Sequence, residues 1–268
     1  MCLILFAVNE HPEYPLVLAA NRDEFLQRPT APAGWWNDNH GTLGGRDLKA
    51  GGTWLGITRS GRLAAVTNVR EPGVTVEDAR SRGELVTAVL HADRSPEALI
   101  PDLDGRAYNG FNLMSYQDGV VVHGTNRGDV GAALPAVNRV ASGIHGLSNA
   151  TLDTPWPKVV EGRIRLSEAL RKLEPGRIDW QPFLDLLAAS DPAPDSRLPQ
   201  TGVPLELERA LSSSFIRTGG YGTRCSTVVL ISADGTCHFL ERSYPSLDGS
   251  RFEDRTFTLP LQAKEAQP

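Results

Sequence analysis

The stretch Leu16-Val17-Leu18-Ala19-Ala20-Asn21-Arg22-Asp23-Glu24-Phe25 places four polar residues directly after an apolar run. A short continuous apolar run bounded by turn signals is typical of a buried strand. A second such run covers residues 3–8, and Pro12 and Pro15 mark a turn between the two. This pattern predicts a buried antiparallel hairpin. In such a hairpin the polar end of the second strand lies near the start of the first, which is Cys2.

The remainder of the chain alternates strand pairs with helices. Strand pairs joined by glycine-containing turns are predicted at residues 53–58 and 63–67, 111–116 and 120–123, and 227–232 and 237–241. Helical periodicity predicts helices over residues 77–92, 154–173 and 180–189, the second capped by Thr154 with Pro155 in its first turn. Because the strands pair locally and rarely alternate with single helices, the pattern favours an α+β architecture of antiparallel sheets covered by helices. We expect one domain over residues 1–268.

Composition excludes several classes of function. A net charge of −5 without a cluster of Lys or Arg argues against nucleic-acid binding, which depends on cation–phosphate contacts. The three cysteines, Cys2, Cys225 and Cys237, are too few and too scattered for a disulfide framework, and no Cys-x-x-Cys pair indicates zinc. The apolar start of the chain is too short for a signal peptide or a membrane span. We therefore expect a cytoplasmic protein with no membrane span and no metal site.

Cys2 is the first candidate for chemistry. Removal of Met1 would expose a thiol beside a free α-amine, whose ordinary pKa of about 8 lets it accept a proton near neutral pH. One residue would then supply both the nucleophile and the base, as in amino-terminal nucleophile hydrolases. The alternative is a small buried side chain that opens a strand and takes no part in chemistry.

The polar run Asn21-Arg22-Asp23-Glu24 has two interpretations. It can be a solvated strand end, where an exposed Arg–Asp pair contributes little to stability. Within the predicted hairpin, however, Arg22 and Asp23 lie close to Cys2. A cation there lowers the pKa of the thiol, and a carboxylate can hold or orient the terminal amine.

Several motifs in order along the chain give it a specific resemblance. The chain resembles the NRDE family, whose animal members are called transport and Golgi organisation protein 2 homologs. The matching segments are Met1-Cys2, Leu18-Ala19-Ala20-Asn21-Arg22-Asp23-Glu24-Phe25, Arg28-Pro29, Gly51-Gly52-Thr53-Trp54-Leu55-Gly56, Ala65-Val66-Thr67-Asn68, Gly146-Leu147-Ser148-Asn149-Ala150, Thr154-Pro155-Trp156, Tyr221-Gly222-Thr223-Arg224 and Phe239-Leu240-Glu241-Arg242.

The NRDE family in turn resembles amino-terminal nucleophile (Ntn) hydrolases of the bile-salt hydrolase and penicillin V acylase type. This resemblance implies an α+β fold, a four-layer αββα sandwich with two antiparallel sheets. It implies Cys2 as the nucleophile with Arg22 and Asp23 beside it, although the acylases space their Arg and Asp differently.

The same resemblance implies further site residues. Asn68 ends the strand that carries an oxyanion-hole residue in those enzymes, and Asn149 resembles the Asn of their Leu-Thr-Asn segment; the alternative for both is a turn Asn bonded to its own backbone. Arg224 resembles the remaining catalytic cation. Arg217 is its rival, because the acylases carry a similar Ser-x-Phe-x-Arg stretch, and a clamp for a substrate carboxylate is a third role for either arginine.

Two functions of different classes follow as expectations. The first is a cysteine-nucleophile Ntn-type hydrolase that acts on a non-peptide amide or a thioester and requires no cofactor. The second is a non-catalytic carrier or chaperone on the same fold, since animal members of the family are linked to haem transfer and to lipid or acyl-CoA balance. The partner would be a small acyl or amide substrate in the first case and a hydrophobic ligand, haem included, in the second. A structural role in a secretory complex is a third interpretation.

Overall fold

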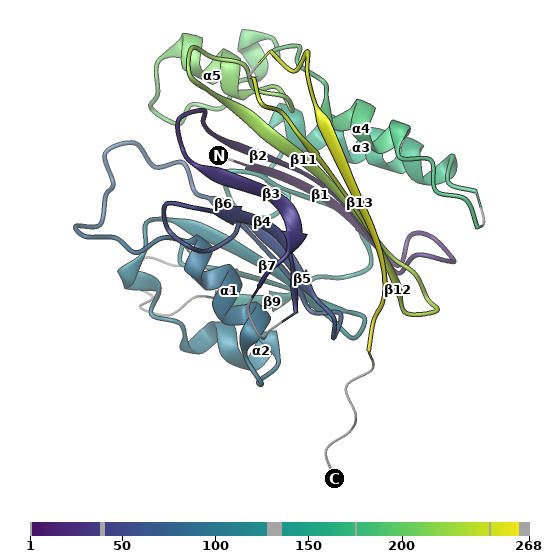
Figure 1. The fold of residues 1–268 in the computed structure, drawn as a ribbon. Coiled ribbons are helices and arrows are strands. Elements are labelled where there is room, and N and C mark those ends of the chain that lie inside the picture. Colours follow the sequence, from purple (N-terminus) through teal and green to yellow (C-terminus); the bar gives the residue numbers. More distant parts are fainter. Residues whose placement is uncertain (1, 38–40, 128–135, 175, 247, 263–268) are drawn as a thin grey trace.

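The chain folds into two stacked antiparallel sheets with helices on both outer faces, as Figure 1 shows. The structure is a computed structural model that describes residues 2–37, 41–127, 136–174, 176–246 and 248–262, with Cys2 described by its backbone alone. No helix of this described part is long and apolar enough to cross a membrane.

The first sheet contains both ends of the described chain. In spatial order it consists of β10 (Gly143–Leu147), β1 (Cys2–Val8), β2 (Leu16–Phe25), β11 (Tyr221–Ile231), β12 (Thr236–Ser243) and β13 (Glu253–Pro260). The second sheet consists of β3 (Thr30–Trp35), β4 (Thr42–Asp47), β5 (Leu55–Thr58), β6 (Leu63–Asn68), β7 (Phe111–Gln117), β8 (Val120–Thr125) and β9 (Ala136–Arg139).

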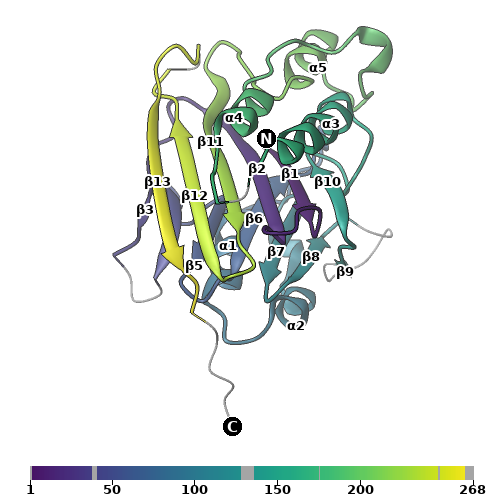
Figure 2. The ribbon, with the colours of Figure 1, turned by 90° about the vertical axis from the view of Figure 1, so that its right-hand side faces the viewer.

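Helices cover the outer face of each sheet, so that the molecule has four layers (Figure 2). On the first sheet lie α3 (Pro157–Arg171) and α4 (Gln181–Leu187), with α5 (Leu205–Leu211) near the strand ends; on the second lie α1 (Gly83–His91) and α2 (Pro96–Leu99). Three apolar clusters fill the three spaces between layers, because each sheet is apolar on both faces. The predicted αββα sandwich is therefore confirmed.

The opening hairpin has the predicted pairing but a longer second strand. β1 and β2 pair antiparallel, with Ile4 opposite Ala20. The polar run does not end the strand: β2 continues to Phe25, and Asn21, Arg22 and Asp23 are all buried. The interpretation of this run as a solvated strand end is wrong: β11 pairs with the other edge of β2, Asn21 is hydrogen-bonded to the end of α4, and Arg22 lies against the ring of Trp54.

The helices are shorter than their periodicity predicts. The first begins at Gly83 rather than at residue 77, while its predicted apolar face, Leu85, Val86, Val89 and Leu90, is buried as expected. The second begins after Trp156, which caps it in place of Thr154, and its Ile164 is 56% exposed. The prolines explain this start: Pro157, not Pro155, occupies the first turn, where a missing N–H costs nothing.

Candidate active site

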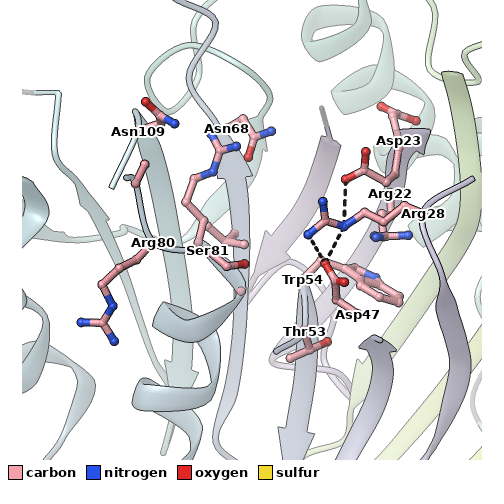
Figure 3. Close-up of a pocket in the computed structure, with 15 residues that line it drawn as sticks. Arg22, Asp23, Arg28, Asp47, Thr53, Trp54, Asn68, Arg80, Ser81 and Asn109 are labelled. Atoms are coloured by element: carbon pink, nitrogen blue, oxygen red, sulfur yellow. Dashed lines mark hydrogen bonds and ion pairs between the residues drawn. The ribbon is translucent and has the colours of Figure 1, made fainter. Parts of the chain in front are cut away.

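A cavity of about 310 Å³ opens between one pair of sheet ends. One wall comes from β2 and the residues that follow it, and the other comes from the end of β6 and from the residues that lead into α1 (Figure 3). The predicted site residues Arg22, Asp23 and Asn68 all line it. The fold thus brings residues from the two sheets to one cavity.

The backbone of Cys2 lies at the same end of the first sheet. Cys2 opens β1 and is paired directly with Arg22 of β2, and Arg22 is paired on its other side with Cys225 of β11. The predicted proximity of Cys2 and Arg22 is therefore confirmed at the level of the backbone. Met1 and the Cys2 side chain lie outside the described residues.

Arg22 is buried and held on two sides. Its guanidinium lies over the ring of Trp54, 4.1 Å from the centroid, and Nη1 donates to the hydroxyl of Thr30 at 3.1 Å. The quadrupole of an aromatic ring attracts a cation placed over its face and so holds it there. The side chain therefore provides a fixed positive charge next to the strand position of Cys2.

Asp23 is buried on the neighbouring strand position, with 2% of its surface exposed. Its Oδ1 accepts a hydrogen bond of 2.7 Å from the hydroxyl of Thr223. Burial raises the pKa of Asp23, although the charge of Lys158 and the Thr223 hydrogen bond act in the opposite direction. Such a carboxyl gains most from a positive charge brought close to it, and the terminal amine of a processed chain would be one.

Asn21, the first residue of the motif, has a structural role that sequence reasoning did not assign. Its Nδ2 donates to the carbonyls of Leu187 and Ser214, both at 2.8 Å, and its Oδ1 accepts from the hydroxyl of Ser226 at 2.6 Å. One side chain thus joins β2 to the end of α4, to the segment before β11 and to β11 itself. Strand alternation gave no signal for this role, because it places Asn21 on the same face as Asp23, which does line the cavity.

Asn149 is hydrogen-bonded to the backbone of Asn68. Asn149 is 1% exposed, and its Nδ2 donates to the backbone carbonyl of Asn68 at 2.9 Å. Asn149 follows β10, in which Leu147 is paired with Ile4, so that the chain from Leu147 to Asn149 runs along β1 toward Cys2. The two predicted oxyanion residues are therefore neighbours, with Asn68 on the cavity wall and Asn149 buried next to it.

The Gly-Gly-Thr-Trp segment forms the floor between the two walls. A Cβ on Gly52 would lie 2.6 Å from the backbone carbon of Gly83, so this segment contacts the first turn of α1 directly, backbone to backbone. Thr53 and Trp54, which follow, both line the cavity together with Ser81 and Arg82. Glycine is required at position 52 because any side chain would push α1 and its flanking residues away from the cavity.

An ionic cluster that sequence reasoning missed closes one side of the cavity. Arg28 donates to the carboxylate of Asp47 at 2.7 Å and lies 3.7 Å from that of Glu24, contacts that Figure 3 marks. Burial alone would raise the pKa of Asp47, but the bonds from Arg28 and from the backbone of Ala50 outweigh it and lower that pKa. The cluster joins the end of β2 to β4, and the matching motifs covered Glu24 and Arg28 but not Asp47.

The structure does not bring Arg224 or Arg217 to this cavity. Arg224 lines a second cavity, and its Nη1 donates to the carbonyls of Phe25, Leu26 and Arg28. This arginine therefore fastens the turn after β2. Arg217 is exposed and lies over the ring of Phe215 at 5.1 Å. Sequence pattern alone left these two arginines as rivals because neither motif specifies where the side chain points.

The second cavity, of about 440 Å³, shares the Trp54 wall with the first. Its other walls combine apolar side chains, Pro32, Tyr244 and Phe252 among them, with the charged Arg224 and Glu253 and the buried carboxyl of Glu241. Burial raises the pKa of Glu241, which accepts a hydrogen bond of 2.6 Å from the backbone of Ala33. The described residues contain no group of three or more His, Cys, Asp or Glu side chains that could hold a metal ion.

Comparisons with known proteins support the fold and show the family. The solved structure of a Caenorhabditis elegans N-acylethanolamine-hydrolyzing acid amidase ortholog superposes with a TM-score of 0.51 at 14% identity, covering 85% of this chain and 92% of that one, which supports the amino-terminal nucleophile hydrolase fold. The human Transport and Golgi organization protein 2 homolog is 37% identical over 98% of this chain and 100% of its own length. The Drosophila melanogaster protein is 28% identical over 92% and 94%. The family model described as Transport and Golgi organisation 2 matches residues 1–246 of this chain. The chain therefore belongs to this family, which is the NRDE family of the sequence motifs.

Proposed function

We propose that this protein is a cysteine-nucleophile hydrolase that cleaves a non-peptide amide or a thioester. The observation that carries the proposal is the pairing of Cys2 with Arg22 at a cavity lined by Arg22, Asp23 and Asn68. A strand-opening cysteine at this place in an amino-terminal nucleophile hydrolase fold is where that chemistry needs its thiol. Removal of Met1 is part of the proposal, because the free α-amine serves as the base.

The reaction proceeds through an acyl-enzyme. The sulfur of Cys2 attacks the acyl carbon while the α-amine accepts the thiol proton, and the carbonyl oxygen becomes an oxyanion. Collapse of this intermediate breaks the bond to the amine or thiol leaving group, which takes the proton from the α-ammonium. Water, deprotonated by the same amine, then attacks the thioester, and the acid is released with the free thiol.

The residues around Cys2 have separate tasks in this mechanism. The positive charge of Arg22 favours the thiolate form of the cysteine, and the carboxylate of Asp23 favours the ammonium form of the amine. Asn68 and Asn149 stabilise the oxyanion. An amide donor that is fixed in advance and aimed at a developing oxyanion lowers the activation free energy by about 3 kcal/mol. The hydrogen bond to the backbone carbonyl of Asn68 fixes the amide of Asn149 in this way.

The test uses intact mass and turnover together. Purified protein should lack Met1 and should gain one acyl group at Cys2 from activated p-nitrophenyl esters. A panel of fatty-acyl p-nitroanilides and thioesters then measures hydrolysis by release of nitroaniline or thiol. Cys2→Ala should abolish both labelling and turnover while its circular dichroism and melting temperature stay unchanged. Undiminished turnover by Cys2→Ala, or retention of Met1 in the purified protein, would refute the proposal.

A matched pair of arginine variants tests the role of Arg22. Arg22→Gln should raise the pKa of the Cys2 thiol and so lower the fraction of thiolate at pH 7. Alkylation by iodoacetamide should then slow, by up to about tenfold if that pKa rises by about 1. Arg224→Gln removes the same charge from the second cavity and should leave the alkylation rate of Cys2 within about twofold of wild type. Equal slowing in both variants would contradict a specific role for Arg22.

The second cavity favours one alternative, a carrier of acyl or lipid-like ligands. Its apolar side chains, Pro32, Tyr244 and Phe252 among them, offer a surface to an acyl chain. Haem suits it less, because the side chains there that ligate haem iron in other proteins are engaged: the Cys225 thiol is hydrogen-bonded to Glu241, and the Tyr244 hydroxyl lies 3.2 Å from that of Ser226. Reversible binding of a fatty acyl-CoA by the Cys2→Ala variant, with no turnover by wild type on the same compound, would favour the carrier.

A further inference from the structure

Arg70 and Glu208 form a buried ion pair beside the candidate site. Nη1 of Arg70 donates to the carboxylate of Glu208 at 2.7 Å, and each side chain is 5% exposed. Arg70 lies two residues after Asn68, which ends β6, whereas Glu208 belongs to α5 in the outer layer of the other sheet. The pair therefore connects the end of the second sheet to a helix of the first.

The backbone of Arg70 is bonded to the oxyanion candidates themselves. Its N–H donates to the carbonyl of Asn149 at 2.8 Å, and the amide of Asn149 donates in turn to the carbonyl of Asn68 at 2.9 Å. Residues 68–70 and Asn149 thus form one closed hydrogen-bonded unit. The position of this unit relative to the cavity depends on what holds Arg70.

Other contacts of the pair fix its two ends. The guanidinium of Arg70 lies 4.8 Å from the centroid of Trp156, the capping residue of α3. Glu208 also accepts from the backbone N–H of Thr201 at 2.9 Å and from the hydroxyl of Thr201 at 2.5 Å. Arg70 is consequently held from α3 and α5 together, and its side chain has little freedom to move.

Stability alone is a weak reason for this arrangement. Desolvation offsets most of the attraction within a buried ion pair, and apolar residues of similar volume often stabilise a fold equally well. Burial lowers the pKa of Arg70, which expresses the same cost. An ion pair does fix the direction and the distance between its two side chains. The hydrogen-bonded unit of residues 68–70 and Asn149 needs both to be fixed.

We infer that Arg70 and Glu208 are positioning residues that hold Asn68 and Asn149 in place at the cavity. The inference rests on the proposed hydrolase function. Neither side chain lines the cavity, so each acts through the hydrogen-bonded unit rather than on the substrate. Their loss should therefore lower kcat and leave KM nearly unchanged, because misplacement by about 1 Å can cost about a hundredfold in rate.

The kinetic test compares four variants with a control. Glu208→Gln retains the size and an acceptor oxygen but removes the charge, and the double variant Arg70→Met/Glu208→Leu replaces the pair by apolar volume. Both should lose about ten- to a hundredfold in kcat with the p-nitroanilide or thioester that wild type hydrolyses. Arg70→Lys, which keeps the charge, should retain more activity than Arg70→Met. Leu230→Ala, a core change toward the opposite end of β11, lowers stability and should leave kcat unchanged.

A second measurement does not depend on turnover. The side-chain amide of Asn149 gives an NH₂ resonance that Asn149→Asp removes and so identifies. In Glu208→Gln and in the double variant this resonance should shift and its hydrogens should exchange faster with water, while Leu230→Ala leaves both unchanged. If wild type turns over and the folded double variant has the same kcat, the positioning role is overturned while the proposed function stands. Absence of wild-type turnover overturns the proposed function, and an unmoved Asn149 resonance then overturns the positioning as well.

Discussion

The amide of Asn149 is fixed at both ends, and through it the two sheets are joined at the candidate site. Nδ2 donates to the carbonyl of Asn68 at 2.9 Å, and Oδ1 accepts from the hydroxyl of Ser148 at 3.3 Å. Asn68 ends β6 in one sheet, whereas Asn149 follows β10 in the other. An amide nitrogen carries two hydrogens, so the bond to Asn68 uses one and fixes the direction of the second.

Replacement of this amide should affect both stability and rate. Asn149→Asp cannot donate to the carbonyl of Asn68, so we expect a loss of about 1–3 kcal/mol in the free energy of unfolding, measured by urea titration. We expect kcat to fall by about a hundredfold or more with any substrate that wild type hydrolyses. Asn138→Asp, on an exposed position of β9, should change neither quantity. A fall in stability with kcat intact would leave Asn149 a purely structural residue.

Asn21 should behave as a structural residue although it opens the most recognisable motif. Asn21→Ala leaves the carbonyls of Leu187 and Ser214 and the hydroxyl of Ser226 without their buried partner. The expected cost is roughly 3 kcal/mol in the free energy of unfolding. At temperatures where the variant is folded, alkylation of Cys2 should proceed at the wild-type rate. Slower alkylation of the folded variant would show that Asn21 also acts on the thiol.

The contact between Gly52 and Gly83 predicts a strong effect of a single methyl group. Gly52→Ala places a Cβ 2.6 Å from the backbone of Gly83, and neither backbone segment can yield without moving α1 or the cavity floor. We expect a destabilisation of about 1–3 kcal/mol in thermal or urea unfolding. Gly219→Ala is the matched control, because a Cβ there meets no atom within 4 Å. Equal stability of the two variants would contradict the close approach.

His123 makes the stability depend on pH in the acid range. Burial lowers the pKa of His123 from 6.5 to about 4, so folding favours the neutral ring, which lies 3.1 Å from Oδ1 of Asn112. Its contribution to stability is therefore complete above pH 6.5 and is lost as the pH falls toward 4. The difference between these two pKa values corresponds to about 3 kcal/mol.

The glutamine variant isolates this contribution. His123→Gln does not titrate but still offers an amide to Asn112, so its free energy of unfolding should fall less than that of wild type between pH 7 and pH 4. Urea titrations at pH 7, 5.5 and 4 provide the comparison. Parallel pH dependence in the two proteins would show that His123 is not held neutral by the fold.

Much of the fold was predictable because its strands pair with their neighbours in the chain. Apolar runs broken by turn residues predicted the hairpins of β1 with β2, β7 with β8 and β11 with β12, and the register of a hairpin follows from its turn. The true length of β2 was not predictable in the same way. Its polar end continues as a strand only because β11, some two hundred residues later, pairs with it.

The sequence by itself determined the family, the sheet-forming hairpins and the candidates Cys2, Arg22, Asp23, Asn68 and Asn149, since these depend on local pattern and on the order of motifs. Only the tertiary structure decided which polar residues face the cavity. It turned Asn21 away from the site, assigned Arg224 to the turn after β2, and brought Glu208 to Arg70. The physical reason is that a side chain's partners come from strands and helices distant in sequence, and their positions follow from packing the four layers rather than from any single segment.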